Sequence, residues 1–242
     1  MIDTILFDLD GTLLHFTQDA FIGAYFNELK KVFAGMGLCA DHSVKSLWIG
    51  TRAMQLNDGS ELNKQKFWKG FAQSMELDEK ETSAIEAACD SFYANEFNRV
   101  KTIMTPSDIP QRLVRTMAAR GYDVVLATNP LFPLCGIESR LEWTGLQVQD
   151  FVLVTHYGNS SYCKPNPGYY LEVFEKIGKT PQQCIMIGNN PAEDMCVGDL
   201  GAETFLVTDC LENEALADIT KYRRGTLDEL EAYLMAMKTL RM

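Results

Sequence analysis

Two aspartates stand two positions apart at the end of an apolar run near the start of the chain. The run reads ILFDLDGTLL, residues 5 to 14. The Asp8 carboxylate is suited to attack a phosphoryl group, forming an acyl phosphate that water then cleaves. Asp10 is suited to protonate the departing alkoxide and later to take a proton from water. Gly11 permits a tight turn and a close approach of the backbone to phosphate. These residues predict phosphoryl transfer.

Further polar residues follow a second apolar run and occupy a later loop. Thr128 and Asn129 end the run DVVLATN, and Lys164 precedes a proline and an expected helix beginning near Asn166. The Thr128 hydroxyl and backbone N–H groups near Asn129 are predicted to bind phosphoryl oxygens, whose charge Lys164 would neutralise. Lys164 therefore joins Asp8 and Asp10 as a catalytic candidate.

The elements that must position these residues alternate along the chain. After the first strand (2–9), we expect strands at 123–128, 151–155, 184–188 and 204–208, and helices at 110–120, 133–144, 167–177, 191–200 and 227–239. Continuous apolar strands alternating with helices are typical of a parallel sheet covered on both faces. The fold class predicted is therefore α/β, with a Rossmann-like doubly wound sheet. Ligands of such sheets bind beyond the carboxyl ends of the strands.

The stretch 17–104 has a different pattern. Phe21, Tyr25 and Leu29 recur at helical spacing, and Asp78 is placed to cap a later helix. Four helices without a strand predict a helical domain inserted into a catalytic core formed by 1–16 and 105–242.

Composition limits the classes of partner. The 242 residues carry a formal net charge of −11 and no basic run, which argues against nucleic acid and anionic membranes as partners. A small phosphorylated metabolite remains compatible, because a metal ion and one or two cations can reverse the local field. Seven scattered cysteines, with no apolar leader behind basic residues, predict a cytoplasmic protein. The oligomeric state is left open.

The whole core resembles the haloacid dehalogenase superfamily. The resemblance rests on FDLDGTLL, LATN, KPNP and GNNPAED, which match the four motifs of that family in order and spacing. It implies a phosphoaspartate on Asp8, acid–base work by Asp10, phosphate contacts from Thr128 and Lys164, one Mg²⁺, and a C1-type cap formed by the insertion. The dehalogenases themselves lack the second aspartate of the first motif. Asp10 therefore favours a phosphatase.

The fourth motif departs from the commonest pattern of the family. Gly188 is followed by Asn189, where the family carries a metal-binding aspartate that shares Mg²⁺ with the Asp8 carboxylate and the Asp10 carbonyl. An amide oxygen is an acceptable ligand but brings no charge, so weaker binding is expected. Asp194 would compensate by binding the metal directly or through water, with Glu193 as a substitute.

Substrate choice and three rival functions stay open in the sequence. Arg52, Asn57 and Asp58 lie in or beside a turn-rich loop of the insertion and are candidates for substrate specificity. A phosphomutase would use the same residues. A catalytically impaired member that binds a phosphorylated ligand or a protein would explain Asn189. A response-regulator receiver ranks last, because its phosphoacceptor ends the third strand and its domain is about half this length.

Overall fold

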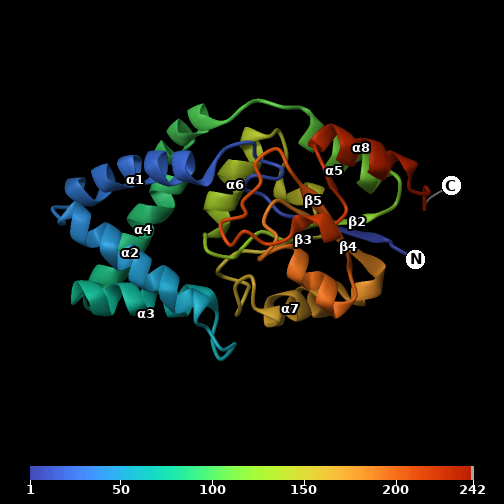
Figure 1. Cartoon of the computed structure of the whole chain (residues 1–242). Coiled ribbons are helices and arrows are strands. Elements are labelled where there is room, and N and C mark those ends of the chain that lie inside the picture. The colour runs from blue at the N-terminus through green and yellow to red at the C-terminus, as the bar shows by residue number, and fades with distance from the viewer. Residues whose placement is uncertain (241–242) are drawn as a thin grey trace.

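A six-stranded sheet forms the centre of the computed structural model, which describes residues 1–240 (Figure 1). The strands lie in the order β3-β2-β1-β4-β5-β6, and every neighbouring pair is parallel. They are β1 (Thr4–Phe7), β2 (Asp123–Leu126), β3 (Leu153–Val154), β4 (Cys184–Gly188), β5 (Glu203–Val207) and β6 (Arg224–Gly225). This confirms the predicted α/β Rossmann-like core.

Successive residues of each strand face opposite sides of the sheet, and both sides are covered. Ile5 and Phe7 pack in one hydrophobic cluster, whereas Leu6 packs in another. The first cluster includes side chains from α5 (Ile109–Ala119), α6 (Leu134–Trp143) and α8 (Leu227–Ala236). The second includes α7 (Pro167–Ile177). In Figure 1, α5 and α8 lie above the strands and α7 lies below them.

Four helices occupy the chain between β1 and α5, and residues 17–104 are called the inserted helices below. They are α1 (Gln18–Gly35), α2 (Ala40–Gln55), α3 (Asn63–Met75) and α4 (Glu79–Ala94), followed by a 3₁₀ segment, Glu96–Ile103. Phe21, Tyr25 and Leu29 form the buried face of α1, as their spacing predicts. Asp78 caps α4 in a reciprocal capping box with Glu81. Figure 1 shows these helices on one side of the sheet and both termini on the other.

The prediction of a helix at 191–200 is wrong for the first half of that range. Only Met195–Leu200 is helical, and it is a 3₁₀ segment. The Asn190 side chain accepts hydrogen bonds from the N–H groups of Ala192 and Glu193, while Asp194 accepts from the N–H of Asn190. These side-chain bonds close a turn over residues 190–194, and the helical segment begins only after that turn.

The first and third strands are shorter than predicted, and further differences lie at the end of the chain. The two-residue strand β6 has no apolar run of its own and was not predicted, and α8 ends at Ala236 rather than at residue 239. The core range 105–242 includes two final residues that lie outside the described part. Within residues 1–240, no helix is both long and apolar enough to cross a membrane.

Candidate active site

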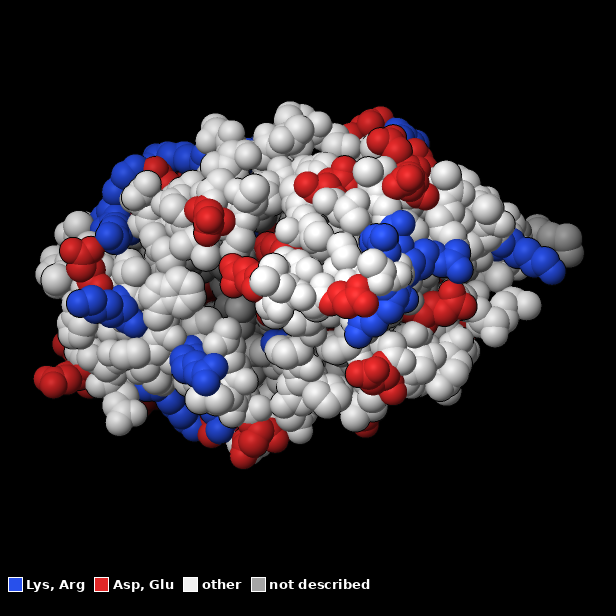
Figure 2. Space-filling model, viewed as in Figure 1, with Lys and Arg blue, Asp and Glu red and all other residues white. Residues whose placement is uncertain are grey.

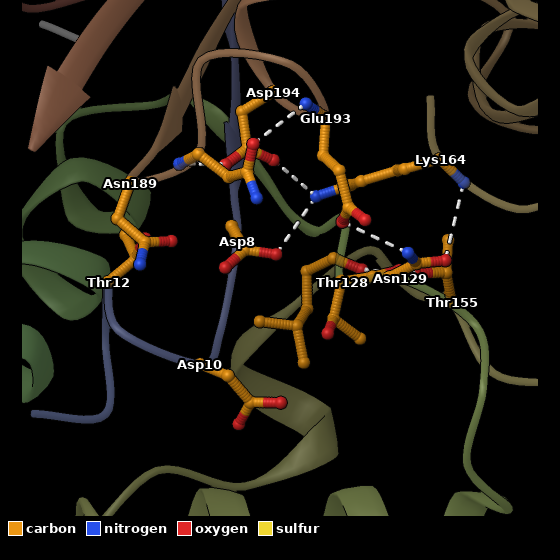
Figure 3. A network of polar contacts seen from close by, with 12 residues as sticks. Asp8, Asp10, Thr12, Thr128, Asn129, Thr155, Lys164, Asn189, Glu193 and Asp194 are labelled. Atoms are coloured by element: carbon orange, nitrogen blue, oxygen red, sulfur yellow. Dashed lines mark hydrogen bonds and ion pairs between the residues drawn. The ribbon is translucent and has the colours of Figure 1, made fainter. Parts of the chain in front are cut away.

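Two of the predicted residues, Asp8 and Asn189, lie close together because of the order of the strands. β1 lies between β2 and β4, with Phe7 in register with Leu126 on one side and Ile187 on the other. The chain therefore moves outward from β1 in both directions, which creates a topological switch point at the carboxyl edge. Asp8 and Asn189 leave adjacent strands at this edge (Figure 3).

Lys164 lies between two carboxylates at this edge. Its Nζ is 2.9 Å from Oδ1 of Asp8 and 2.6 Å from Oδ1 of Asp194. The lysine side chain is fully buried, and the side chains of Asp8 and Asp194 are 11% and 2% exposed. One cation facing two buried carboxylates leaves the triad with an excess of negative charge (Figure 3).

The pKa values of this triad follow from burial and charge. Burial raises the pKa of Asp8 well above its usual value; Lys164 opposes the shift and Asp194 adds to it. For Lys164, burial acts to lower the pKa, but the charges of Asp194 and Asp8 outweigh burial and raise it. The lysine is therefore protonated, and its single charge does not fully offset the burial of Asp8.

Asn189 is held firmly against the loop after β1. Its Nδ2 donates to the carbonyl oxygen of Cys210 at 2.7 Å, and its Oδ1 accepts from the Thr12 hydroxyl at 3.3 Å. Gly11 has a φ of +75°, and a Cβ atom there would lie 2.1 Å from Asn189 Nδ2. Glycine is therefore required for backbone conformation and for the position of Asn189.

Asp10 has a partner that sequence reasoning missed. Its Oδ2 accepts a hydrogen bond from Nη1 of Arg140, whose side chain on α6 is fully buried. The Arg140 guanidinium lies 4.2 Å above the ring centroid of Phe132. The signal available in the sequence was an arginine three residues after Ile137 and directly before Leu141, at the spacing of a buried helix face.

Two atoms of this pair are buried without a hydrogen-bond partner in the described chain, Oδ1 of Asp10 and Nη2 of Arg140. Oδ1 of Asp10 is therefore the oxygen left free to exchange a proton with a bound molecule. Figure 3 shows the Asp10 side chain pointing away from Lys164.

The predicted phosphate-binding residues lie beside the triad. The carbonyl of Thr128 accepts from the hydroxyls of Thr155 and Tyr169, at 2.7 and 2.9 Å, which fixes the backbone after β2. Asn129 donates to Oε2 of Glu193 at 3.0 Å and accepts from the backbone N–H of Lys164 at 3.3 Å. Thr128 and Asn129 both line the cavity at this edge.

The three predicted specificity residues do not line that cavity. Asn57 is buried in its own loop, where it donates to the carbonyl of Glu61 and to Oδ1 of Asn63. Asp58 accepts from the N–H and hydroxyl of Ser60 and is exposed. Arg52 borders a separate, more open hollow behind Lys164. A turn-rich composition indicated a loop, but that loop bonds internally and packs against Ser160 and Tyr162 of the core, not over Asp8.

The cavity itself has a volume of about 250 Å³ and lies between the inserted helices and the core. Figure 2 shows a hollow there, with acidic side chains beside it. Glu212 lines the cavity; burial raises its pKa to about 7, and the charges of Asp10, Glu193 and Asp194 add to the effect. The core end of the cavity is thus strongly acidic.

The oxygen atoms at this end fit the needs of Mg²⁺. No three His, Cys, Asp or Glu side chains in residues 1–240 form a metal-binding group by themselves. The predicted metal ligands include groups outside those residue types, because they combine the Asp8 carboxylate with the Asp10 backbone carbonyl and Oδ1 of Asn189. All are hard oxygen donors, and the surplus negative charge around Lys164 favours a cation. Asp194 is already bonded to Lys164 and to the N–H of Asn190.

Comparisons with solved structures agree with this fold. A 2-haloacid dehalogenase from Pseudomonas syringae superposes with a TM-score of 0.63 at 19% identity, covering 97% of this chain and 99% of that one. A HAD phosphatase from Thermococcus onnurineus gives a TM-score of 0.60 at 17% identity, covering 99% and 100%. A putative HAD-hydrolase from Bacillus subtilis, described as bound to magnesium, gives 0.54 at 20% identity, covering 96% and 98%. At these identities the likeness shows the fold alone.

Two sequence comparisons are more specific. Flavin mononucleotide hydrolase 1 of Arabidopsis thaliana is 28% identical over 98 residues, which is 38% of this chain and only 36% of that relative's length. The model of the haloacid dehalogenase-like hydrolases matches residues 2–195. That range contains Asp8, Asp10, Lys164, Asn189 and Asp194. The chain therefore belongs to the haloacid dehalogenase-like hydrolase family.

Proposed function

We propose that this hydrolase is a Mg²⁺-dependent phosphatase that cleaves a small phosphomonoester through an aspartyl phosphate on Asp8. The observation that carries the proposal is the buried triad of Asp8, Lys164 and Asp194, with Asp10 held beside it by Arg140. Oδ1 of Asp8 is bonded to Lys164, which leaves Oδ2 as the attacking atom. A second acidic residue with a free oxygen supports phosphate chemistry over carbon–halogen cleavage.

In the first step, Oδ2 of Asp8 bonds to phosphorus as the bond from phosphorus to the ester oxygen breaks. A proton on Oδ1 of Asp10 passes to the departing alkoxide, which leaves as the alcohol. In the second step, Asp10 takes a proton from water, whose oxygen attacks phosphorus. The acyl–phosphate bond breaks, inorganic phosphate leaves and Asp8 is regenerated. The Thr128 hydroxyl binds phosphoryl oxygens throughout, while Lys164 holds Oδ1 of Asp8 in place and contributes positive charge next to the site.

Bound Mg²⁺ would supply the positive charge that the dianionic phosphoryl group needs beside Asp8 and Asp194. Asp8, the Asp10 carbonyl and Asn189 are the residues that would hold it, and the Thr12 hydroxyl would orient Asn189. The inserted helices act in this proposal as the cap, which excludes water from the cavity during the first step.

The test is a panel of phosphorylated metabolites, assayed for phosphate release with Mg²⁺ and with a chelator. Flavin mononucleotide belongs in the panel because of the Arabidopsis relative. Asp8→Asn should lower turnover at least about 1,000-fold, because the nucleophile is lost. Asp3→Asn is the matched control: it changes the same residue type near the opposite end of β1, where Asp3 pairs with Lys179.

Equal turnover by the parent and Asp8→Asn would overturn the proposal. If the chelator does not affect phosphate release, the proposed requirement for Mg²⁺ is wrong. Phosphate released in isotopic water should carry one labelled oxygen, whereas a phosphomutase would pass the phosphoryl group to a second hydroxyl without label. Detectable turnover that depends on Asp8 would exclude an impaired member of the family.

A further inference from the structure

The far end of the cavity differs in chemistry from the end at Asp8. Away from the sheet, its wall is built largely from aromatic side chains. They come from the inserted helices and from the loop after β2: Phe21, Tyr25, Trp48, Phe67, Trp68 and Phe132. Phe67 and Trp68 meet edge to face with ring centroids 5.1 Å apart. Such a wall favours a flat apolar group.

The charged residues of the wall limit which leaving groups fit the cavity. Over the described residues 1–240, no Lys, Arg or His side chain lines this cavity. The charged side chain contributed by the inserted helices is Asp90. A carboxylate or a second phosphate on the leaving group would meet no cation there, and burying an unpaired charge is costly. The leaving group that fits is therefore uncharged.

Trp68 adds a directional element to this wall. Its side chain is buried, with 8% exposed. Its Nε1 lies near the Tyr157 hydroxyl and partly offsets the rise in pKa that burial gives that group, but it makes no hydrogen bond of normal geometry in the part of the chain described. Trp143, another buried tryptophan, donates from Nε1 to Oδ1 of Asn98 at 2.8 Å. An unpaired buried donor costs about 1–3 kcal/mol. A ligand with an acceptor beside its ring would satisfy the Trp68 donor.

We infer, resting on the proposed phosphatase activity, that the substrate is the phosphomonoester of an uncharged aromatic alcohol whose ring carries a hydrogen-bond acceptor. The ring lies among the aromatic side chains of the inserted helices, and the acceptor binds Nε1 of Trp68. The ester oxygen then faces Asp10, and phosphorus faces Asp8. The reaction remains the two-step hydrolysis given above.

The test uses primary alkyl phosphates, so that leaving-group chemistry is similar throughout. The probes are 2-phenylethyl phosphate, 2-(pyridin-4-yl)ethyl phosphate, isobutyl phosphate and phosphoglycolate. We expect kcat/KM for the phenyl compound to exceed that for isobutyl phosphate at least about tenfold, because the ring buries more apolar surface. Phosphoglycolate, which carries a carboxylate, should be the poorest substrate.

Trp68→Phe keeps an aromatic ring and removes the N–H donor. It should lower the ratio of kcat/KM for the pyridyl over the phenyl compound about tenfold, the size of one hydrogen bond. Trp143→Phe is the matched control, because it removes an indole donor outside the cavity and should leave the ratio unchanged. An equal preference for isobutyl and aromatic esters, or an unchanged ratio in Trp68→Phe, would overturn the inference.

A second measurement separates this inference from the proposed function. Acetyl phosphate is small and needs no aromatic wall, so its hydrolysis by the parent and not by Asp8→Asn tests the phosphatase alone. Binding of the free alcohols, 2-phenylethanol and 2-(pyridin-4-yl)ethanol, is followed by calorimetric titration, which does not depend on the tryptophan removed, and tests the aromatic wall alone. Tighter binding of the pyridyl alcohol in the parent, lost in Trp68→Phe, supports the inference; equal binding in both proteins contradicts it.

Discussion

The buried guanidinium of Arg140 donates through Nη1 to Oδ2 of Asp10, and so joins helix α6 to the loop after β1. The arginine side chain is fully buried, whereas the aspartate side chain is 24% exposed toward the cavity. The pair thus fixes one oxygen of Asp10 and leaves the other available for proton transfer. A change at Arg140 therefore acts on Asp10, and also on Phe132, which lines the cavity.

Arg140→Met should lower the free energy of unfolding by about 2 kcal/mol, because it leaves the Asp10 carboxylate unpaired in a largely buried place. Denaturant titration measures this. Adding Asp10→Asn to the variant removes the stranded charge and should recover part of the loss. Arg112→Met is the control, since that guanidinium pairs with Glu231 at the surface. Equal losses in the two single variants would contradict a buried role for Arg140.

Lys164→Met should cost about 3–5 kcal/mol of stability and abolish turnover, because two buried carboxylates then face each other without a cation. Lys179→Met is a close control. Lys179 also bridges two carboxylates, Asp3 and Asp123, at 3.0 and 2.9 Å, but it is partly exposed at the opposite end of the sheet. Chemical denaturation should show a much smaller loss for Lys179→Met; comparable losses would argue that burial does not govern the Lys164 triad.

Asn189→Asp should bind Mg²⁺ more tightly than the parent, because a carboxylate adds charge to the predicted site. Without metal the variant should be less stable by about 1–3 kcal/mol, since Nδ2 no longer donates to the Cys210 carbonyl and an oxygen faces it instead. Calorimetric titration gives the affinity, and thermal unfolding with and without Mg²⁺ gives the stability. Equal or weaker affinity in the variant would count against Asn189 as a ligand.

Gly11→Ala should destabilise the protein more than Gly37→Ala. Both glycines have positive φ, +75° and +77°, so both variants pay the same conformational cost of about 1 kcal/mol. A Cβ at residue 11 would overlap the Asn189 amide, whereas nothing lies within 4 Å of one at residue 37. Urea unfolding of the two variants therefore isolates the contact with Asn189. Equal urea midpoints for the two variants would show that Asn189 accommodates the added Cβ without a cost in stability.

His156 should make stability fall as pH decreases through about 6.5, the ordinary value in an unfolded chain. Burial lowers the pKa of His156 in the folded protein, with the charge of Lys176 adding to the shift. The unfolded state then binds more protons below pH 6.5, so acid favours unfolding. Protonation would also break the hydrogen bond from the Gly158 N–H to Nδ1.

His156→Gln tests this directly, because glutamine keeps an acceptor but does not titrate. The difference in unfolding free energy between parent and variant should change between pH 7.5 and pH 5, with the parent losing more. A difference that is constant over this range would exclude His156 as the titrating group.

The sequence by itself determined most of the core. Apolar runs alternating with helices predicted the first five strands along the chain, and polar residues directly after those strands predicted the site. This works because strand ends are local features, and the parallel arrangement brings them to one edge. The same local reasoning found the Asp78 cap of α4, which depends on residues three positions apart.

Only the tertiary structure decided the partners of those residues. Arg140 lies 130 positions from Asp10, and Lys164 lies 30 positions from Asp194, so no local pattern links them. In the structure, Asn57 and Asp58 lie outside the cavity, and Nε1 of Trp68 lies beside it without a hydrogen bond of normal geometry. Charge pairing and cavity shape depend on which elements pack together, and that packing follows from the free energy of the whole fold and not from any one segment.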